Sequence, residues 1–246
     1  MITSSIRMSG VCASILFCAI AGTACTHQAP TIAHIHVGHA ITGAHDTHGR
    51  VGYLTLATQH ATDALEHANS AVLPGRELAL IKDDVAAANA VTNAEGSHPL
   101  TVAVREAADH IEFAAMSNDV SDNIKAGYQK FKATIEGVLY RAILIERYAG
   151  DVASSTSEAD ARLLAQEIAK LAHANVHGED LDNNGSIGTT PREYGLDQIG
   201  RELDALVARE DPPYVTVDRW YLFNLIRLPS GEWIFKRSGS SGSRGY

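Results

Sequence analysis

The sequence has little cysteine and no long apolar run. Its 246 residues include three cysteines, Cys12, Cys18 and Cys25, all near the amino terminus. No Cys-x-x-Cys pair and no Cys-x-x-Cys-His motif is present, which argues against a dithiol redox centre and covalently attached haem. The apolar run at residues 11–20 is too short to span a bilayer. Residues after Cys25 contain no cysteine, so no disulfide framework is expected there.

Clustered positive charge is also missing. The formal net charge is -9, with 20 Lys and Arg against 29 Asp and Glu. Because phosphate binding needs clustered Lys and Arg, the composition argues against nucleic acid as a partner. The sequence contains no Gly-x-Ser-x-Gly, Walker, Rossmann or His-Glu-x-x-His motif, so no common catalytic pattern favours an enzyme.

The first 24 residues have the features of an export signal. Arg7 precedes the apolar run, and small residues from Gly22 to Ala24 precede Cys25. This pattern resembles the lipobox of bacterial lipoproteins, in which the cysteine is acylated and becomes the first mature residue. Gly22 departs from the lipobox, which prefers an aliphatic residue there, so ordinary cleavage after Ala24 is the alternative. The resemblance implies a bacterial envelope lipoprotein, anchored to a membrane by lipid on Cys25 and facing the periplasm.

The middle of the chain has helical periodicity. One apolar seam steps by four and three residues through Ala57, Ala61, Ala64, Ala68 and Ala71. A longer seam with the same steps comprises Ile124, Tyr128, Phe131, Ile135, Val138, Ala142 and Ile145. These patterns predict a mainly α fold, a helical bundle of about five to six helices.

Helix boundaries follow from breakers and caps. The predicted helices cover residues 53–73, 77–90, 99–116, 124–149, 158–171 and 190–207. Gly150 is placed to end the fourth helix, and Ser155 to Glu158 have the pattern of a capping box for the fifth. Aromatic and β-branched residues on either side of a Pro-Ser-Gly turn predict a C-terminal β-hairpin. The expected segments are a signal peptide (1–24), a His-rich segment (25–52), the bundle (53–211), the hairpin (212–237) and a disordered tail (238–246).

Histidine is concentrated near the amino terminus. Eight of the twelve lie in the 41 residues from His27 to His67, where an even distribution would place about two. Residues 31–37 are predicted to be extended, which puts His34 and His36 on the same side about 6.5 Å apart, and residues 38–52 are predicted to form a loop. Nitrogen ligands favour copper, zinc or nickel over calcium or magnesium. The predicted ligands of a transition metal are His34, His36, His39, His45 and His48, with Asp46 as ligand or neighbour.

A second candidate metal site lies on the predicted helices. His60, Asp63 and His67 share one face of the first helix, and Glu106 and His110 are four residues apart on the third. Facing helices of a bundle can build such a site. The alternative is a polar face in contact with solvent. Neither helix carries Glu-x-x-His on the right face, which argues against a di-iron centre.

The segment from Asp180 to Ile187 matches D-x-[DN]-x-[DN]-G and resembles the first half of an EF-hand calcium loop. The resemblance implies that Ile187 anchors the loop to the core. The twelfth position, where an EF-hand has a bidentate glutamate, is Pro191, so Glu193 is expected to reach back. The implied calcium ligands are Asp180, Asp182, Asn184, the Ser186 carbonyl and Glu193. A turn without metal is the alternative, because Asp, Asn and Gly favour turns.

Together these patterns favour an envelope lipoprotein that binds a transition metal through its N-terminal histidines, for sequestration or delivery. Calcium at residues 180–193 would have a structural role. The alternative is a structural or adaptor lipoprotein that contacts an envelope protein partner and holds no transition metal. A metal-dependent enzyme is the third interpretation.

Overall fold

The computed structural model describes residues 31–93 and 98–210, Tyr214 and the backbone of three short strands. Seven α-helices lie within these residues, together with two 3-10 turns. The mainly α bundle predicted from the sequence is therefore confirmed, although about five to six helices were predicted and the described residues form seven. The helical elements are α1 (Ile32–Ile41), η1 (His48–Arg50), α2 (Tyr53–Ala71), α3 (Leu78–Asn93), α4 (Leu100–Met116), α5 (Asp122–Ser154), α6 (Glu158–His177), η2 (Pro191–Glu193) and α7 (Leu196–Ala208).

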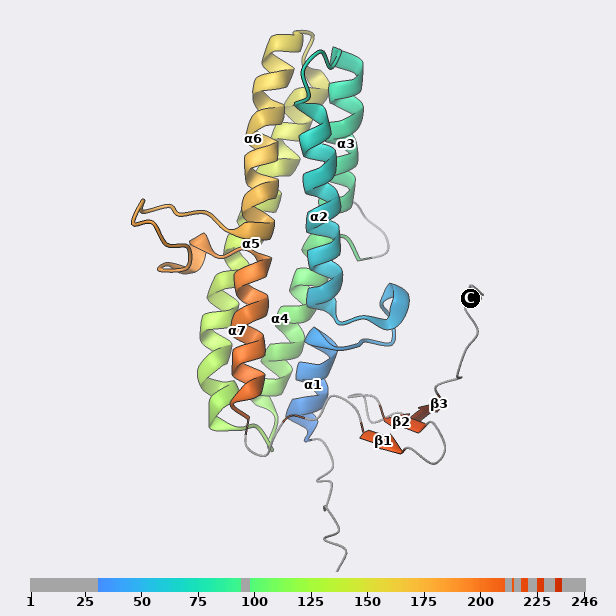
Figure 1. The fold of residues 1–246 in the computed structure, drawn as a ribbon, viewed down its shortest axis with the longest axis vertical. Helices are drawn as coiled ribbons and strands as arrows, with labels where there is room; N and C mark the ends of the chain where they lie inside the picture. Colours follow the sequence, from blue (N-terminus) through green and yellow to red (C-terminus); the bar gives the residue numbers. More distant parts are fainter. Residues whose placement is uncertain are drawn as a thin grey trace, which may run out of the picture.

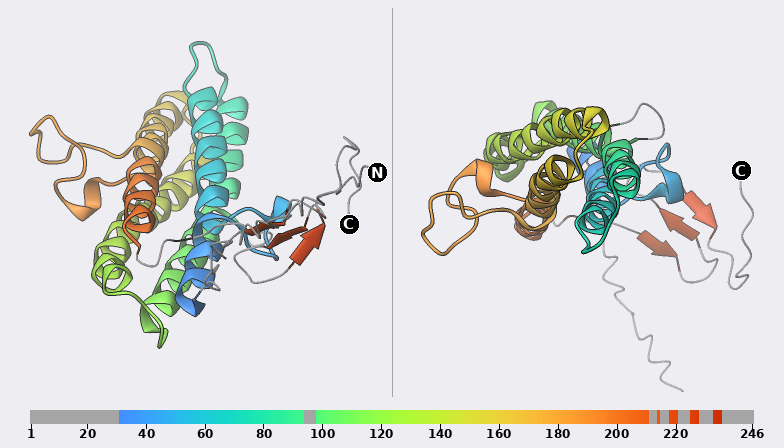
Figure 2. Two further views of the ribbon diagram at one scale, coloured as in Figure 1. Left: turned by 60° about the horizontal axis from the view of Figure 1, so that its bottom comes forward. Right: turned by 90° about the horizontal axis from the view of Figure 1, so that it is seen from above.

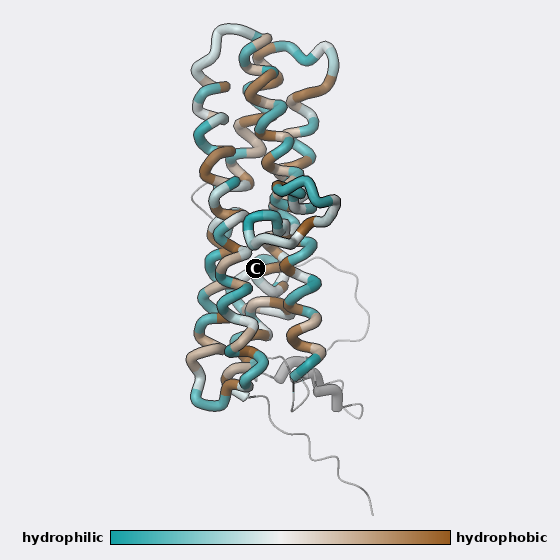
Figure 3. Tube along the Cα trace, turned by 90° about the vertical axis from the view of Figure 1, so that its left-hand side faces the viewer, coloured by the Kyte–Doolittle hydropathy of each residue, from teal (hydrophilic) through white to brown (hydrophobic). Residues whose placement is uncertain are grey.

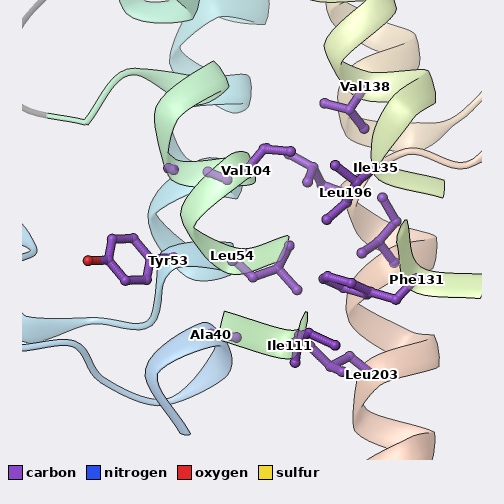
Figure 4. Close-up of a cluster of buried hydrophobic side chains, with 14 of the residues drawn as sticks. Ala40, Tyr53, Leu54, Val104, Ile111, Phe131, Ile135, Val138, Leu196 and Leu203 are labelled. Carbon is purple, nitrogen blue, oxygen red and sulfur yellow. The ribbon is translucent and has the colours of Figure 1, made fainter. Parts of the chain in front are cut away.

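The helices form an elongated bundle (Figure 1). Its buried apolar residues fall into two cores. One core is built by α2, α3, α5 and α6, and the other by α1, α2, α4, α5 and α7. The helix α5 has 33 residues, a length of about 50 Å, so it contributes to both cores. Figure 4 shows the second core, where Leu54, Ile111 and Leu203 from three helices meet.

The two apolar seams of the sequence are the inner faces of α2 and α5. Every alanine of the first seam is buried, and small side chains let α2 pack closely against α3, α4 and α6. Apolar and polar segments alternate along the helices in Figure 3, as expected of helices with one buried face. The loop between α6 and α7 is hydrophilic in the same figure and projects from the bundle, as Figure 2 shows from two further directions.

The predicted extended segment at residues 31–37 is wrong, because Ile32–Ile41 is the helix α1. The loop predicted for residues 38–52 begins later than expected, after Ile41, and includes the turn η1. Thr31 caps this helix, its hydroxyl oxygen accepting a hydrogen bond from the His34 amide at 3.0 Å. The carboxylate of Asp119 accepts from the Ile32 and Ala33 amides at 2.7 and 3.1 Å. A negative charge at this end also offsets the helix dipole. The inner face of α1 is Ala33, Val37 and Ala40.

Several predicted boundaries also differ, among them the end of the fifth helix, which is His177 rather than residue 171. Gly150 does not end the fourth helix, because Ala149 and Val152 continue its buried face to Ser154. Ser157, not Ser155, caps α6 and accepts a hydrogen bond from the Asp160 amide. The sixth helix begins at Leu196 rather than Thr190, after the separate turn η2.

Changing Gly150 to alanine is expected to stabilise the protein by about 0.5–1 kcal/mol, because glycine in a helix interior costs conformational entropy. A Cβ atom at this exposed position meets nothing within 4 Å. The matched control is Gly52→Ala, whose Cβ would lie 2.3 Å from the carbonyl carbon of Ile41. That variant should lose about 1–3 kcal/mol through overpacking. Urea unfolding of both variants measures the difference, and a loss of stability in Gly150→Ala would contradict the assignment.

The C-terminal strands are β1 (Asp218–Trp220), β2 (Leu225–Arg227) and β3 (Trp233–Phe235), in an antiparallel sheet of order β1-β2-β3. The segments joining them lie outside the described residues, so the predicted hairpin of 212–237 stays a prediction. The predicted signal (1–24), Cys25 and the tail (238–246) also lie outside them. Among the described helices, none combines the length and the apolar character needed to cross a bilayer.

Candidate metal centre

Three histidines from two helices meet beside the second core. His36 and His39 are three residues apart on α1, which places them on the same helix face. His110 lies on α4, against which α1 packs. Each offers one ring nitrogen, and the three nitrogens lie within 4.8 Å of one another. We call these residues the histidine triad.

The spacing within the triad suits one transition-metal ion. The Nδ1 atoms of His36 and His110 are 3.2 Å apart. Two nitrogens bound to one tetrahedral zinc at about 2.0–2.1 Å would be about 3.3 Å apart. The Nε2 atom of His39 is buried and has no hydrogen-bond partner among the described residues. Buried polar atoms of this kind need an explanation, and a bound ion supplies one.

Burial keeps the triad in the form that binds metal. Burial, with smaller effects from the neighbouring His39 and His36, lowers the pKa of His110 to about 4. Burial also lowers the pKa of His39, with smaller effects in the same direction from His36 and His45. The pKa of His36 is lowered by burial, although Asp119 opposes the shift. All three rings are therefore neutral near pH 7, as metal binding requires, and a bound ion would replace the hydrogen bond between the Nδ1 atoms of His36 and His110.

Aromatic neighbours hold the rings of the triad. Tyr53, at the start of α2, stacks on His110 with ring centroids 5.4 Å apart and an interplanar angle of 21°. Its hydroxyl points away from the core in Figure 4 and donates to Asp46 at 2.6 Å. Burial and this hydrogen bond raise the pKa of Tyr53. The ring centroid of Phe113 lies 5.5 Å from that of His36 and 6.1 Å from that of His110. The ring of His110 therefore packs against Tyr53 and Phe113, and this packing restricts its orientation.

Only two of the five predicted N-terminal ligands belong to the triad. In a helix His34 and His36 lie on nearly opposite sides, so the predicted convergence of these two is wrong. The Nε2 atom of His34 lies 2.9 Å from Glu210 Oε2, and both side chains are buried. The ring of His45 is 6.4 Å from that of His39, at the edge of the triad. His48 is exposed in η1.

The residues of the second predicted site do not form one group. His110 belongs to the triad, and within the described part of the chain no metal-compatible group of three includes His60, Asp63 or His67. The Nε2 atom of His60 is buried without a hydrogen-bond partner there. Glu106 lies near Tyr53, where its charge adds to the raised pKa of the phenol.

The acidic loop between α6 and α7 brings three carboxylates together. Asp180, Asp182 and Glu193 each offer an oxygen, and these oxygens lie within 4.8 Å of one another. Asp180 accepts hydrogen bonds from the Asn184 and Gly185 amides at 3.1 and 2.8 Å. The side-chain oxygen of Asn184 accepts from the Ser186 amide. Ile187 does not anchor the loop in the core as expected, since it is 43% exposed.

Glu193 is the buried member of this group, with 0% exposure. Its Oε2 atom accepts hydrogen bonds from the amides of Gly188, Thr189 and Thr190 and from the Thr189 hydroxyl, at 2.8 to 3.2 Å. Burial alone would raise the pKa of Glu193, but these bonds hold it below its usual value. The other oxygen, Oε1, is buried and has no partner in the described residues. A carboxylate held ionised with one unused oxygen is suited to binding a cation.

Comparison of the chain with protein-family models, curated proteins and solved structures found no match. Function is therefore inferred from the geometry of the histidine triad and of the three carboxylates.

The residues that surround the triad were not singled out by the sequence. Tyr53 lies four residues before Ala57 on the apolar seam, so the sequence does not distinguish it from a core residue. Phe113 lies off the buried face of α4 and is 51% exposed. His98 lies outside the N-terminal cluster, yet its ring is 5.8 Å from that of Tyr53 and its φ is 53°. A positive φ is uncommon outside glycine and marks a position worth attention, but it is visible only in the structure.

Proposed function

We propose that this protein binds one transition-metal ion of the copper or zinc class at His36, His39 and His110, and stores it or hands it to an acceptor. The observation that carries the proposal is the convergence of three neutral imidazoles, two of them already at the spacing of ligands on one ion. A nitrogen-only set favours zinc, copper or nickel over calcium or magnesium.

Sequestration or delivery fits the ligand number better than a purely structural metal. Structural zinc sites are closed by four protein ligands, whereas three ligands leave a coordination position open. The three histidines are each partly exposed, so an incoming acceptor ligand could reach the ion. The same open position would suit a metal-dependent enzyme, but the sequence carries no common catalytic motif beside it.

Elemental analysis of the purified protein after exposure to Zn²⁺ or Cu²⁺ tests this proposal. The variant changes His36, His39 and His110 together to alanine, and the control changes His48 and His67. We expect the triad variant to bind one ion fewer than the parent protein and the control to bind as many as the parent. Equal metal content in the triad variant and the parent would overturn the proposal.

We also propose that Asp180, Asp182 and Glu193 bind a calcium ion that stiffens the loop between α6 and α7. The unused Oε1 atom of the buried Glu193 supports this, because hydrogen bonding within the loop already occupies its Oε2 atom. An all-oxygen set of flexible geometry suits Ca²⁺, which takes 6–8 oxygen ligands. In this proposal Asn184 and the Ser186 carbonyl would complete the set.

Asp182→Ala is expected to lower the melting temperature only when calcium is present, because the substitution removes a calcium ligand. Calcium at 100 times its Kd would add about 2.7 kcal/mol to the unfolding free energy of the parent protein. Asp204→Ala, at an exposed position on α7, is the control. Thermal unfolding of each protein is followed with calcium and with chelator. An equal loss in both conditions would identify the loop as a turn without metal.

The cellular setting is proposed on the lipobox resemblance alone. We propose that acylated Cys25 anchors the protein to a bacterial membrane, on the periplasmic side. Cys25→Ser is then expected to move the protein from the membrane fraction to the soluble fraction, because the thiol that carries the lipid is gone. Unchanged fractionation of the variant would contradict lipid attachment.

The adaptor interpretation is the second candidate, and one observation favours it. Phe113 and Met116, on one face of α4, are 51% and 70% exposed, and Phe113 lies beside the triad. Exposed apolar residues that lie together can mark a surface for a protein partner. If the triad holds no metal in the experiment above, this surface becomes the leading feature for function.

A further inference from the structure

Two histidines outside the triad lie on neighbouring turns of α6. His173 and His177 are four residues apart, so they share a helix face. Their ring centroids are 4.7 Å apart, and both side chains are exposed. Two histidines at this spacing on a helix can hold one zinc ion between them, as in helical His-x-x-x-His pairs of metalloenzymes.

An acidic residue from the next helix orients one of these rings. The Oδ2 atom of Asp197, in the first turn of α7, lies 2.8 Å from His177 Nδ1. A hydrogen bond between a carboxylate and one ring nitrogen fixes the tautomer and leaves the other nitrogen as a metal ligand. His177 therefore has the arrangement of a metal-binding histidine with its outer partner.

The backbone around this contact is closely packed, and this packing fixes the position of Asp197 relative to His177. The side-chain amide of Gln198 donates to the His177 carbonyl at 2.6 Å, and its oxygen accepts from the Gly195 amide at 3.0 Å. A Cβ atom on Gly195 would lie 2.3 Å from the backbone nitrogen of Gly178. These contacts hold the end of α6 and the start of α7 together at the base of the acidic loop.

We propose that His173 and His177 form a second site for a divalent transition metal, with Asp197 as its positioning residue. The ligand class is Zn²⁺, Cu²⁺ or Ni²⁺, since imidazole nitrogens supply both protein bonds. The site lies on α6 and α7, whereas the triad lies on α1 and α4, so the two can be removed separately. With two protein ligands it binds more weakly than the triad and keeps positions open to water.

Zn²⁺ titration with a competing chromophoric chelator tests the proposal in two backgrounds. In the parent protein and in the triad variant, changing both His173 and His177 to alanine is expected to remove one bound ion. His48→Ala, another exposed histidine, is the control and should remove none. The number of bound ions with and without His173 and His177 is compared within each background. The result can therefore be interpreted even if the triad binds no metal. Unchanged stoichiometry on removing the pair in both backgrounds would overturn the second site.

Asp197→Asn provides a readout that an ordinary surface ion pair would not give. We expect the substitution to lower the Zn²⁺ affinity of the His173–His177 site by about 10-fold. This is within the range for loss of an outer partner of a metal ligand. Circular dichroism with chelator present checks that the helices are unchanged. Unaltered affinity in Asp197→Asn would show that the carboxylate does not position His177 for a metal.

Discussion

Replacing His110 with alanine is expected to weaken Zn²⁺ binding at the triad by about 100-fold or more, since losing an outer partner alone costs 10–100-fold. The change removes the only triad ligand on α4 and leaves His36 and His39 on α1. Two ligands on one turn cannot restore the spacing that His36 and His110 have across the helix interface. Chelator competition measures the affinity directly.

The sharpest control is His34→Ala, because the sequence pattern alone groups His34 with the ligands. In the structure His34 is 5% exposed and paired with Glu210 on the other side of α1. Its removal should leave Zn²⁺ affinity unchanged but cost about 1–3 kcal/mol of stability, because Glu210 loses a buried partner. Urea unfolding in chelator measures that loss. Loss of the ion in His34→Ala, with retention in His110→Ala, would reverse the assignment.

Helical structure was predictable wherever a long apolar seam fixes the face of a helix. The seam from Ile124 to Ile145 spans three heptads, and its period is a local property of the sequence. The helix α5 accordingly covers it, with Ile124, Phe131 and Ile145 buried. The same reasoning holds for the alanine face of α2.

The helix α1 was not predictable because part of its N-terminal capping comes from far along the chain. Asp119, which accepts from the Ile32 and Ala33 amides, is 87 and 86 residues away from them. Locally, histidines alternate with apolar residues from His34 to Val37, a period that favours a strand. Tertiary contact with α4 therefore decides between the two conformations.

The composition of the triad shows the same limit of sequence reasoning. The excess of histidine near the amino terminus correctly pointed to His36 and His39 as members of a group that could hold a metal. His110 was assigned to a different group, because nothing local indicates that α4 lies against α1. The period of a helix predicts which residues share its face, but not which helix that face will meet.

Arg141→Met is expected to lower the free energy of unfolding by about 3 kcal/mol, through three hydrogen bonds to a charged group. Arg141 is 5% exposed, and its guanidinium donates to the Asn175 side chain and to the Arg192 and Tyr194 carbonyls. Burial lowers its pKa to about 10, so it remains charged near pH 7. Methionine fills similar space but leaves all three acceptors without this donor. Urea unfolding measures the loss, with the exposed Arg105→Met as a control expected to stay within about 0.5 kcal/mol.

The same substitution links the bundle to the acidic loop. Arg192 and Tyr194 flank Glu193, so the guanidinium on α5 holds the backbone on both sides of the buried carboxylate. If calcium binds there, Arg141→Met should weaken calcium binding even where the variant is fully folded, because the glutamate is no longer fixed in place. Isothermal titration calorimetry at 10 °C separates this effect from unfolding. Unchanged calcium affinity alongside a large stability loss would show that Arg141 supports the bundle only, with Glu193 held by its bonds to Gly188, Thr189 and Thr190.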